Sequence, residues 1–169
     1  ILGRLVGSEM CIRDSVRDVF QQRHMEKLVG NYGIGHVRYP TAGGAGKEFA
    51  QPMYVNSPYG ISLVHNGNLT NSKQLGNELF HAEMRDLQTD SDSEVLLNIF
   101  AHELGKQREI YPSEKHIFKA VAKTHIRCDG AYAVLALING HGMLAFRDSN
   151  GIRPLSIGVR KGKSRDDYI

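Results

Sequence analysis

Three short segments of the sequence carry side chains that could bind a small zwitterion and stabilise a developing negative charge. Arg38 precedes Tyr39-Pro40 at the end of a strand-like stretch, where a guanidinium could grip a carboxylate through two parallel hydrogen bonds. Asn66-Gly67 could supply a side-chain amide and a backbone N–H as paired donors, which is the arrangement of an oxyanion hole. Asp92 stands at the start of an expected helix, where a buried carboxylate could hold an ammonium group.

Each of these segments also has an ordinary structural interpretation. Arg38 could form a surface ion pair with a nearby acid. Asn-Gly is a common turn sequence, and an acidic residue in the first turn of a helix favours the helix dipole. Taken one at a time, the segments leave both interpretations open.

Two glycine-rich stretches do not match the nucleotide-binding motifs that they superficially suggest. In the stretch Gly43–Lys47, the first glycine of a phosphate-binding loop would fall on Thr41, and Glu48 stands where Ser or Thr is needed. In the stretch Gly33–Gly35, the third glycine of a dinucleotide fingerprint would fall on Arg38. The sequence therefore predicts neither motif.

The cysteines and histidines predict neither a disulfide framework nor a metal site. The sequence has two cysteines, Cys11 and Cys128, and Cys128 stands before a strand, where a half-buried inert thiol is expected. The eight histidines are dispersed without metal-ligand spacing, so structural or hydrogen-bonding roles are expected for them.

Composition indicates a globular protein of one domain. The chain has 169 residues, 41% of them hydrophobic and 23% charged, and its net charge is +3. The basic residues are scattered and do not alternate with aromatic ones, which argues against nucleic-acid binding. Because the sequence lacks a bilayer-length apolar run and a secretory signal pattern, a cytoplasmic location without membrane contact is expected.

The elements that must position the candidate residues can be predicted from periodicity and breakers. The first half of the chain predicts, in order, a helix over 16–28, a strand over 33–38, an irregular loop over 41–52, a strand over 61–64 that runs into a turn at Asn66-Gly67, and a helix from Thr70 or Asn71 to about Asp86.

The second half predicts two helices and then strands. Ser91 and Glu94 have the spacing of a capping box before an apolar run, and a further helix begins at Pro112-Ser113 and ends near Ile126. A strand over 131–138, a hairpin turn at 139–140, a return strand over 143–146 and a third strand over 154–159 follow, and no closing element is expected after residue 161. This order predicts an α+β fold in which helices cover antiparallel sheets.

Residues 16–159 resemble the glutaminase domain of the amidophosphoribosyltransferase family. The resemblance rests on six segments. Segments 33–43, 65–71 and 91–100 hold the candidate residues, and the others are 51–52, 54–61 and 146–155. It implies an N-terminal-nucleophile hydrolase fold, an αββα sandwich that would be incomplete in this chain. It also implies hydrolysis of L-glutamine, with ammonia passed on for the synthesis of 5-phosphoribosylamine in the first step of de novo purine biosynthesis.

The resemblance assigns a role to each candidate residue. Arg38 would bind the α-carboxylate of glutamine, and Asp92 would bind its α-ammonium group. Asn66-Gly67 would form the oxyanion hole, and Thr41 and His36 would shape the pocket.

The family's nucleophile, a cysteine at the start of the mature chain, has no counterpart in the sequence. Too few residues separate Cys11 from Arg38 to hold the family's intervening strands, so Cys11 is not expected to be this nucleophile. Residues 1–15 match nothing in the family and resemble translated adapter sequence, and we expect them not to be native. Residues 16–169 are then expected to be a partial glutaminase domain, inactive alone.

The resemblance also implies partners outside the chain. A phosphoribosyltransferase domain of the same protein would bind Mg²⁺ and receive the ammonia, and the full-length protein is expected to form a homo-oligomer. Two alternatives stay open. One is the glutaminase domain of another class II amidotransferase such as glucosamine-6-phosphate synthase, which typically has Trp-Ala-Thr where this chain has Tyr39-Pro40-Thr41. The other is a non-catalytic glutamine-binding remnant.

Overall fold

A four-stranded antiparallel sheet lies at the centre of the structure, a computed structural model that describes residues 20–37, 47–163 and 165–169. Its strands follow the order β1 (Met53–Val55), β2 (Ile61–Leu69), β3 (Gly130–Ile138) and β4 (Gly142–Arg147). The predicted hairpin at Asn139-Gly140 is confirmed, because Gly140 adopts a φ of 77° between β3 and β4.

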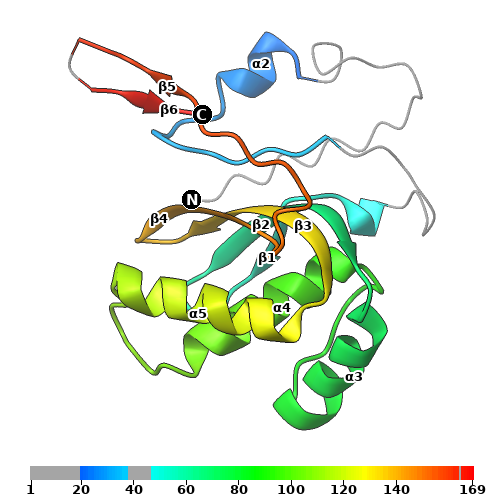
Figure 1. Cartoon of the computed structure of the whole chain (residues 1–169). Coiled ribbons are helices and arrows are strands. Elements are labelled where there is room, and N and C mark those ends of the chain that lie inside the picture. Colours follow the sequence, from blue (N-terminus) through cyan, green and yellow to red (C-terminus); the bar gives the residue numbers. More distant parts are fainter. Residues whose placement is uncertain (1–19, 38–46, 164) are drawn as a thin grey trace.

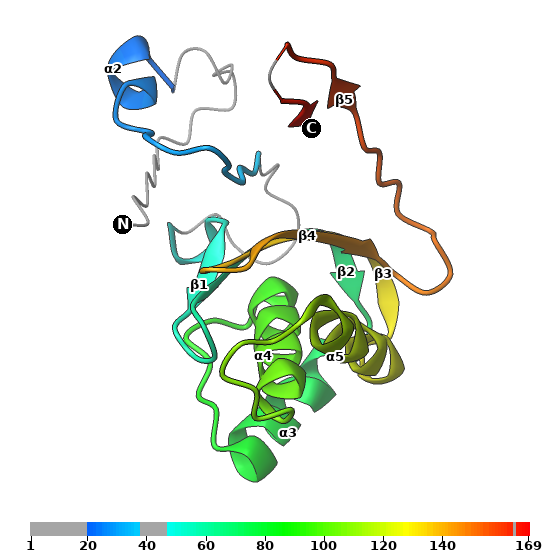
Figure 2. The same cartoon turned by 90° about the vertical axis from the view of Figure 1, so that its left-hand side faces the viewer.

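Three helices cover one face of this sheet (Figures 1 and 2). They are α3 (Ser72–Glu83), α4 (Asp92–Gly105) and α5 (Glu114–Arg127). Helix α4 packs against β1 and β2 and also between the other two helices, and most of its side chains are therefore buried. The predicted α+β class with an antiparallel sheet under helices is confirmed.

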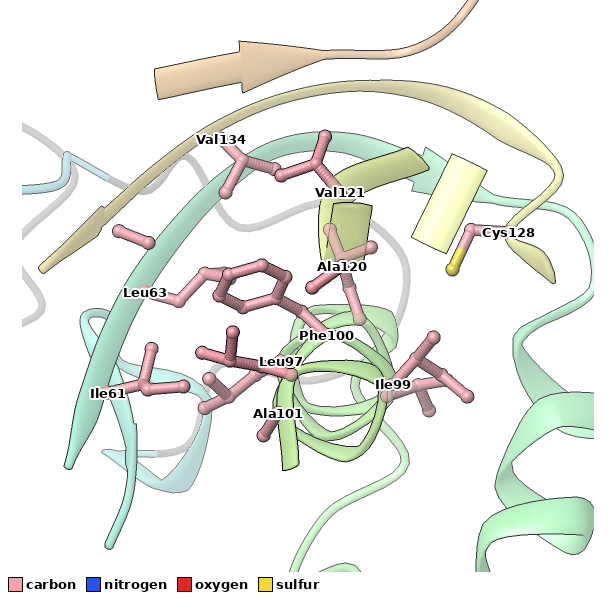
Figure 3. Packing of buried hydrophobic residues seen from close by; sticks show 14 of the residues in the cluster. Ile61, Leu63, Leu97, Ile99, Phe100, Ala101, Ala120, Val121, Cys128 and Val134 are labelled. Carbon is pink, nitrogen blue, oxygen red and sulfur yellow. The ribbon is translucent and has the colours of Figure 1, made fainter. Parts of the chain in front are cut away.

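The core lies between the sheet and α4 (Figure 3). Because side chains alternate along a strand, Ile61 and Leu63 of β2 and Val134 of β3 face the helices, where Phe100 of α4 is fully buried. The ring of Phe100 lies 5.9 Å from that of Phe146 on β4. The same alternation directs the even-numbered residues of β2 to the opposite face of the sheet.

The helix starts follow the predicted capping residues. Asn71 and Ser113 are the N-caps of α3 and α5, and the Ser91 side chain accepts the Ser93 N–H at the start of α4. The reciprocal capping box predicted for Ser91 and Glu94 is wrong, because the Ser91 side chain caps Ser93 rather than Glu94, and the Glu94 carboxylate accepts the backbone N–H groups of Gln88 and Thr89 instead of that of Ser91.

The segments on the other side of the sheet differ most from the prediction. These are α2 (Gln22–Met25) and a two-stranded pair of β5 (Val159–Arg160) and β6 (Asp167–Tyr168), which lie away from the helical layer (Figures 1 and 2). The predicted helix over 16–28 is helical only at 22–25 within its described part, and α2 buries no residue that would stabilise it by packing.

Two predicted strands are wrong for the same reason. Residues 33–37 form no strand, and of the strand predicted over 154–159 only Val159 is extended into a ladder. A strand requires a partner, and within the described residues Val159-Arg160 pairs only with β6, a closing element that the polar C-terminal sequence did not predict. The loop predicted over 41–52 holds a short 3-10 turn, η1 (Lys47–Phe49), and its residues 41–46 lie outside the described ranges.

Within the described residues, no helix combines the length and apolar character that crossing a bilayer requires.

Candidate active site

The Asn66-Gly67 pair lies inside strand β2, and the predicted turn at this position is wrong. Strand β2 pairs with β3 along its whole length, with Asn66 opposite Ala133 and Gly67 opposite Tyr132. A Cβ atom on Gly67 would lie 2.0 Å from the Ala131 carbonyl oxygen and 2.7 Å from the Tyr132 Cα. Glycine is therefore required here by close strand approach, and long-range pairing overrides the local turn signal.

The backbone N–H of Gly67 faces the outer edge of β2. Tyr132 of β3 directs its own N–H and carbonyl away from β2, because the N–H donates to the Asp148 carboxylate and the carbonyl accepts the Asp148 N–H. The pair formed by Gly67 and Tyr132 is consequently not a hydrogen-bonded one, and Gly67 directs its N–H away from β3.

This outer edge of β2 is no longer covered by β1 at Gly67. Pairing between the two strands reaches only Leu63, opposite Met53. Further along the same edge, the His65 N–H donates to Gln51 Oε1 at 2.6 Å and the Leu69 N–H donates to Asp92 Oδ2 at 3.0 Å. The described residues supply no such acceptor for the N–H of Gly67 between them, so this donor is available to a ligand.

The side chain of Asn66 lies on the face of the sheet away from the helices. Its Oδ1 accepts a hydrogen bond from a terminal nitrogen of Arg153 at 2.8 Å. The loop that carries Arg153 is held by Asp148, which accepts the backbone N–H groups of Ile152 and Arg153 at 2.9 and 3.1 Å. Burial opposes the charge on Asp148, but these backbone donors outweigh it and lower the pKa of the carboxyl.

Asp92 presents its carboxylate where the first turn of α4 meets β2. Its side chain is 23% exposed, with Oδ2 bound to the Leu69 N–H and Oδ1 lying 3.7 Å from Nδ1 of His65. One oxygen is therefore fixed by the backbone, and the carboxylate remains accessible to solvent.

His65 forms a buried polar support behind Asp92. Its Nδ1 lies 3.0 Å from Oγ of Ser93, which also accepts from the side-chain amide of Gln51 at 3.0 Å. Burial lowers the pKa of His65 and outweighs the opposing attraction of Asp92, while the charges of His36 and Arg153 lower it further. A neutral His65 leaves Asp92 as the charged partner of the two.

The structure brings together most of the predicted site residues that it describes. Asn66 and Gly67 are neighbours on β2, Asp92 is bonded to the same strand, and partly exposed His36 acts electrostatically on His65. Arg38 and Thr41 lie outside the described residues.

Sequence reasoning missed four residues of this arrangement, which are Gln51, His65, Ser93 and Arg153. A signal was present for His65, because it continues the inward-facing alternation of Ile61 and Leu63 and a buried imidazole requires partners.

The thiol that the structure describes is not a candidate nucleophile. Cys128 is buried in the core, and desolvation raises the pKa of its thiol to about 12. The expectation of an inert thiol is confirmed, and Cys128 is more deeply buried than expected. Cys11 lies outside the described residues. Among the residues whose placement is described, no group of three or more His, Cys, Asp or Glu side chains is arranged to hold a metal ion.

A cavity of about 440 Å³ lies elsewhere, at the helical layer, where residues such as Asn71, Glu78, Lys106 and Arg127 line it. It includes none of the candidate site residues, and its Arg127 is already bound by three carboxylates.

Comparison with known proteins identifies the class to which this fold and site belong. A family model described as "Glutamine amidotransferase domain" matches residues 45–165, which is more than half of the chain, and the chain therefore belongs to this family. The curated relatives are named more narrowly, as amidophosphoribosyltransferases. The chain is 57% identical to that of Pseudomonas aeruginosa over 154 residues and 58% identical to that of Escherichia coli over 156 residues. Each alignment covers 91% of this chain and 31% of the relative, so the chain spans about a third of the length of these proteins.

Two solved structures show the same fold. One is titled glutamine phosphoribosylpyrophosphate amidotransferase from B. subtilis complexed with ADP and GMP, and it matches with a TM-score of 0.57 and 32% identity over 76% of this chain and 25% of that one. The other, titled the allosteric regulatory enzyme of purine biosynthesis, matches with a TM-score of 0.58 and 35% identity over the same shares. The fold is that of the N-terminal-nucleophile hydrolases, of which the described residues show a sheet with one covering layer of helices.

Proposed function

We propose that this chain is part of the glutaminase domain of an amidophosphoribosyltransferase, in which it binds L-glutamine and stabilises the hydrolysis of the glutamine side-chain amide. The ammonia would pass to a phosphoribosyltransferase domain of the same protein, where it would convert phosphoribosyl pyrophosphate to 5-phosphoribosylamine. The observation that carries the proposal is the edge of β2, where an accessible N–H of Gly67 lies two residues from the amide that holds Asp92.

Recognition of the amino acid rests on opposite charges at its two ends. Asp92 would pair with the α-ammonium group, because its carboxylate is charged, oriented by the Leu69 N–H and open to solvent. Arg38 would bind the α-carboxylate, as the family motif around it implies. Pairing both ends would favour free glutamine over a peptide.

Stabilisation of the reacting amide rests on two donors. When a nucleophile attacks the side-chain carbonyl of glutamine, negative charge develops on its oxygen. The Gly67 N–H and the Asn66 side-chain NH₂ would donate to that oxygen. The family's cysteine would pass its thiol proton to its own α-amino group, and its thiolate would attack the side-chain carbonyl carbon. The amide nitrogen would take up that proton and leave as ammonia, and water would hydrolyse the resulting thioester to glutamate. This thiol is not among the described residues.

The relatives favour this function over transfer of ammonia to another acceptor, because curated proteins that are 57%, 58% and 51% identical to the chain carry the amidophosphoribosyltransferase name. The proposal includes a cytoplasmic location, a homo-oligomeric full-length protein, and Mg²⁺ bound by the phosphoribosyltransferase domain. No specific observation favours the glucosamine-6-phosphate synthase alternative. Binding of glutamine without hydrolysis by the full-length protein would support the alternative of a non-catalytic glutamine-binding remnant.

Calorimetric titration of the chain with L-glutamine tests the binding half of the proposal. Asp92→Asn should weaken binding by at least about tenfold, since a charge pair of about 1.4 kcal/mol or more is lost. Asp90→Asn makes the same chemical change at an exposed residue just before α4 and is the matched control. N-acetyl-L-glutamine lacks the ammonium group, so its weaker binding should not respond to Asp92→Asn. Equal binding of glutamine by both variants would overturn the proposal.

A further inference from the structure

We propose that Arg153 is a positioning residue that sets the orientation of the Asn66 side-chain amide and so creates one of the two oxyanion donors. The inference rests on the proposed function and concerns the same site. It assigns a role to a residue of a distant loop for which the sequence analysis predicted none.

The direction of the hydrogen bond carries the argument. A guanidinium has donors and no acceptor, whereas an asparagine amide has an oxygen that accepts and a nitrogen that donates. Arg153 can therefore bind only Oδ1 of Asn66, which lies 2.8 Å from its terminal nitrogen. This contact turns Nδ2, the donor required at an oxyanion, away from Arg153.

Without this partner the Asn66 amide would have little to select its orientation. The terminal torsion of asparagine is broad and roughly two-fold, so an unrestrained amide can present its oxygen as easily as its nitrogen. Asn66 is exposed, and within the described residues its side chain hydrogen-bonds to Arg153. An oxygen in place of the NH₂ would repel an oxyanion.

Arg153 is itself held in register with the site. Asp148 is buried and accepts the Tyr132 N–H at 3.1 Å as well as the Arg153 N–H at 3.1 Å. Tyr132 is also the residue that stands opposite Gly67 in the sheet. A single β3 residue thus fixes both the loop that orients Asn66 and the strand position that supplies the Gly67 N–H.

The charge of Arg153 reaches the same region. Its guanidinium contributes to lowering the pKa of His65, behind Asp92. A fixed positive group beside Asn66 would also favour the negative charge that develops on the substrate oxygen.

The test measures glutamine hydrolysis by the full-length protein that carries this chain. Removing one oxyanion donor costs about 10²–10³ in kcat in other enzymes, and a misoriented amide should cost part of that. We expect Arg153→Met to lower kcat about 10-fold or more while KM changes by less than about twofold, because the groups proposed to bind the zwitterion are untouched. Arg153→Lys keeps the charge but not the planar fork, so its kcat should lie between those of the unsubstituted protein and Arg153→Met.

Two further measurements separate positioning from a structural effect. The loss in Arg153→Ala should be partly restored by added guanidinium ion at concentrations too low to unfold the protein. Arg160→Met removes an exposed arginine that bonds Asp167 at the β5–β6 pair and should leave kcat unchanged. Thermal unfolding of each variant reports whether the fold is intact.

The outcomes distinguish the two proposals. If the unsubstituted protein binds glutamine but does not hydrolyse it, the proposed function fails and the glutamine-binding remnant takes its place. If the unsubstituted protein hydrolyses glutamine and Arg153→Met retains its kcat, only the positioning role is overturned. A rise in the KM of Arg153→Met without a loss of kcat would also overturn the positioning role, because Arg153 would then act in substrate binding.

Discussion

The Oδ2 atom of Asp92 accepts the Leu69 N–H at 3.0 Å, which joins the first turn of α4 to strand β2. This bond satisfies a strand amide beyond the reach of β1 and orients the carboxylate at the same time. The residue proposed to bind the substrate ammonium is therefore also a structural connection, and its two roles can be separated by substitution.

Asp92→Ala and Asp92→Asn should differ in stability. Alanine leaves the Leu69 N–H without an acceptor and should lower the free energy of unfolding by about 1–3 kcal/mol. Asparagine retains an acceptor oxygen at the same position, so its cost should be about 1 kcal/mol or less. Urea unfolding of both variants measures the difference, and equal losses would show that the bond to Leu69 contributes nothing.

The sequence predicted those elements of the fold whose signals are local. Ser91 and Ser113 mark the helix starts by capping, and the turn at Asn139-Gly140 predicts its hairpin, because each signal lies within a few residues of the structure it determines. The strands predicted over 33–38 and 154–159 lacked such support. Whether they form depends on a partner strand, which a local pattern cannot identify.

The candidate site was predictable in part for the same reason. Asn66, Gly67 and Asp92 were identified from residue type and family motif, and the structure brings them to one strand. Arg153 lies 87 residues from Asn66 in the chain, and its contact depends on how the loop after β4 returns to β2. Only the fold supplies that information.

Gly67→Ala should be severely destabilising. The new Cβ would collide with backbone atoms of Ala131 and Tyr132, which cannot move aside without separating β2 from β3. We expect a loss of more than about 3 kcal/mol in the free energy of unfolding. Gly140→Ala is the matched control, because Gly140 also has a positive φ but no atom within 4 Å of its added Cβ. Its cost should be only about 1–2 kcal/mol of backbone strain. Equal losses would contradict the close-approach argument.

Arg127→Met should lower the free energy of unfolding, because one guanidinium links three carboxylates of the helical layer. The Arg127 guanidinium lies 2.8, 2.7 and 2.9 Å from the carboxylates of Glu78, Glu83 and Glu103. The side chains of Glu83 and Glu103 are only 7% and 8% exposed. Removing the guanidinium therefore takes an ion-pair partner from each of two buried carboxylates. Unfolding experiments at pH 7 should show a loss of about 3 kcal/mol.

The loss in Arg127→Met should depend on pH. Burial opposes the charge of Glu103, but hydrogen bonds from Arg127 and Lys106 outweigh it and lower its pKa in the folded protein. That stabilisation is present above the unfolded pKa, near 4.5, and disappears as the pH falls through the lower folded value. The difference in stability between the two proteins should therefore shrink as the pH falls below 4.5. Lys123→Met, an exposed position on the same helix, controls for the loss of a cation.

His65→Gln should change how stability responds to mild acid. Burial lowers the pKa of folded His65 below its ordinary value of 6.5, so the unfolded chain binds the proton more readily. The folded state is thus fully stable with respect to this group above pH 6.5 and loses stability as the pH falls toward the lower folded pKa. The unfolding free energy of the wild type relative to His65→Gln should decline from pH 7 to 5, by at most about 1.4 kcal/mol per pH unit. His81→Gln, at an exposed histidine of α3, controls for the substitution itself. A difference that grows as the pH falls would mean that Asp92 holds a proton on His65, reversing the charge assignment of this pair.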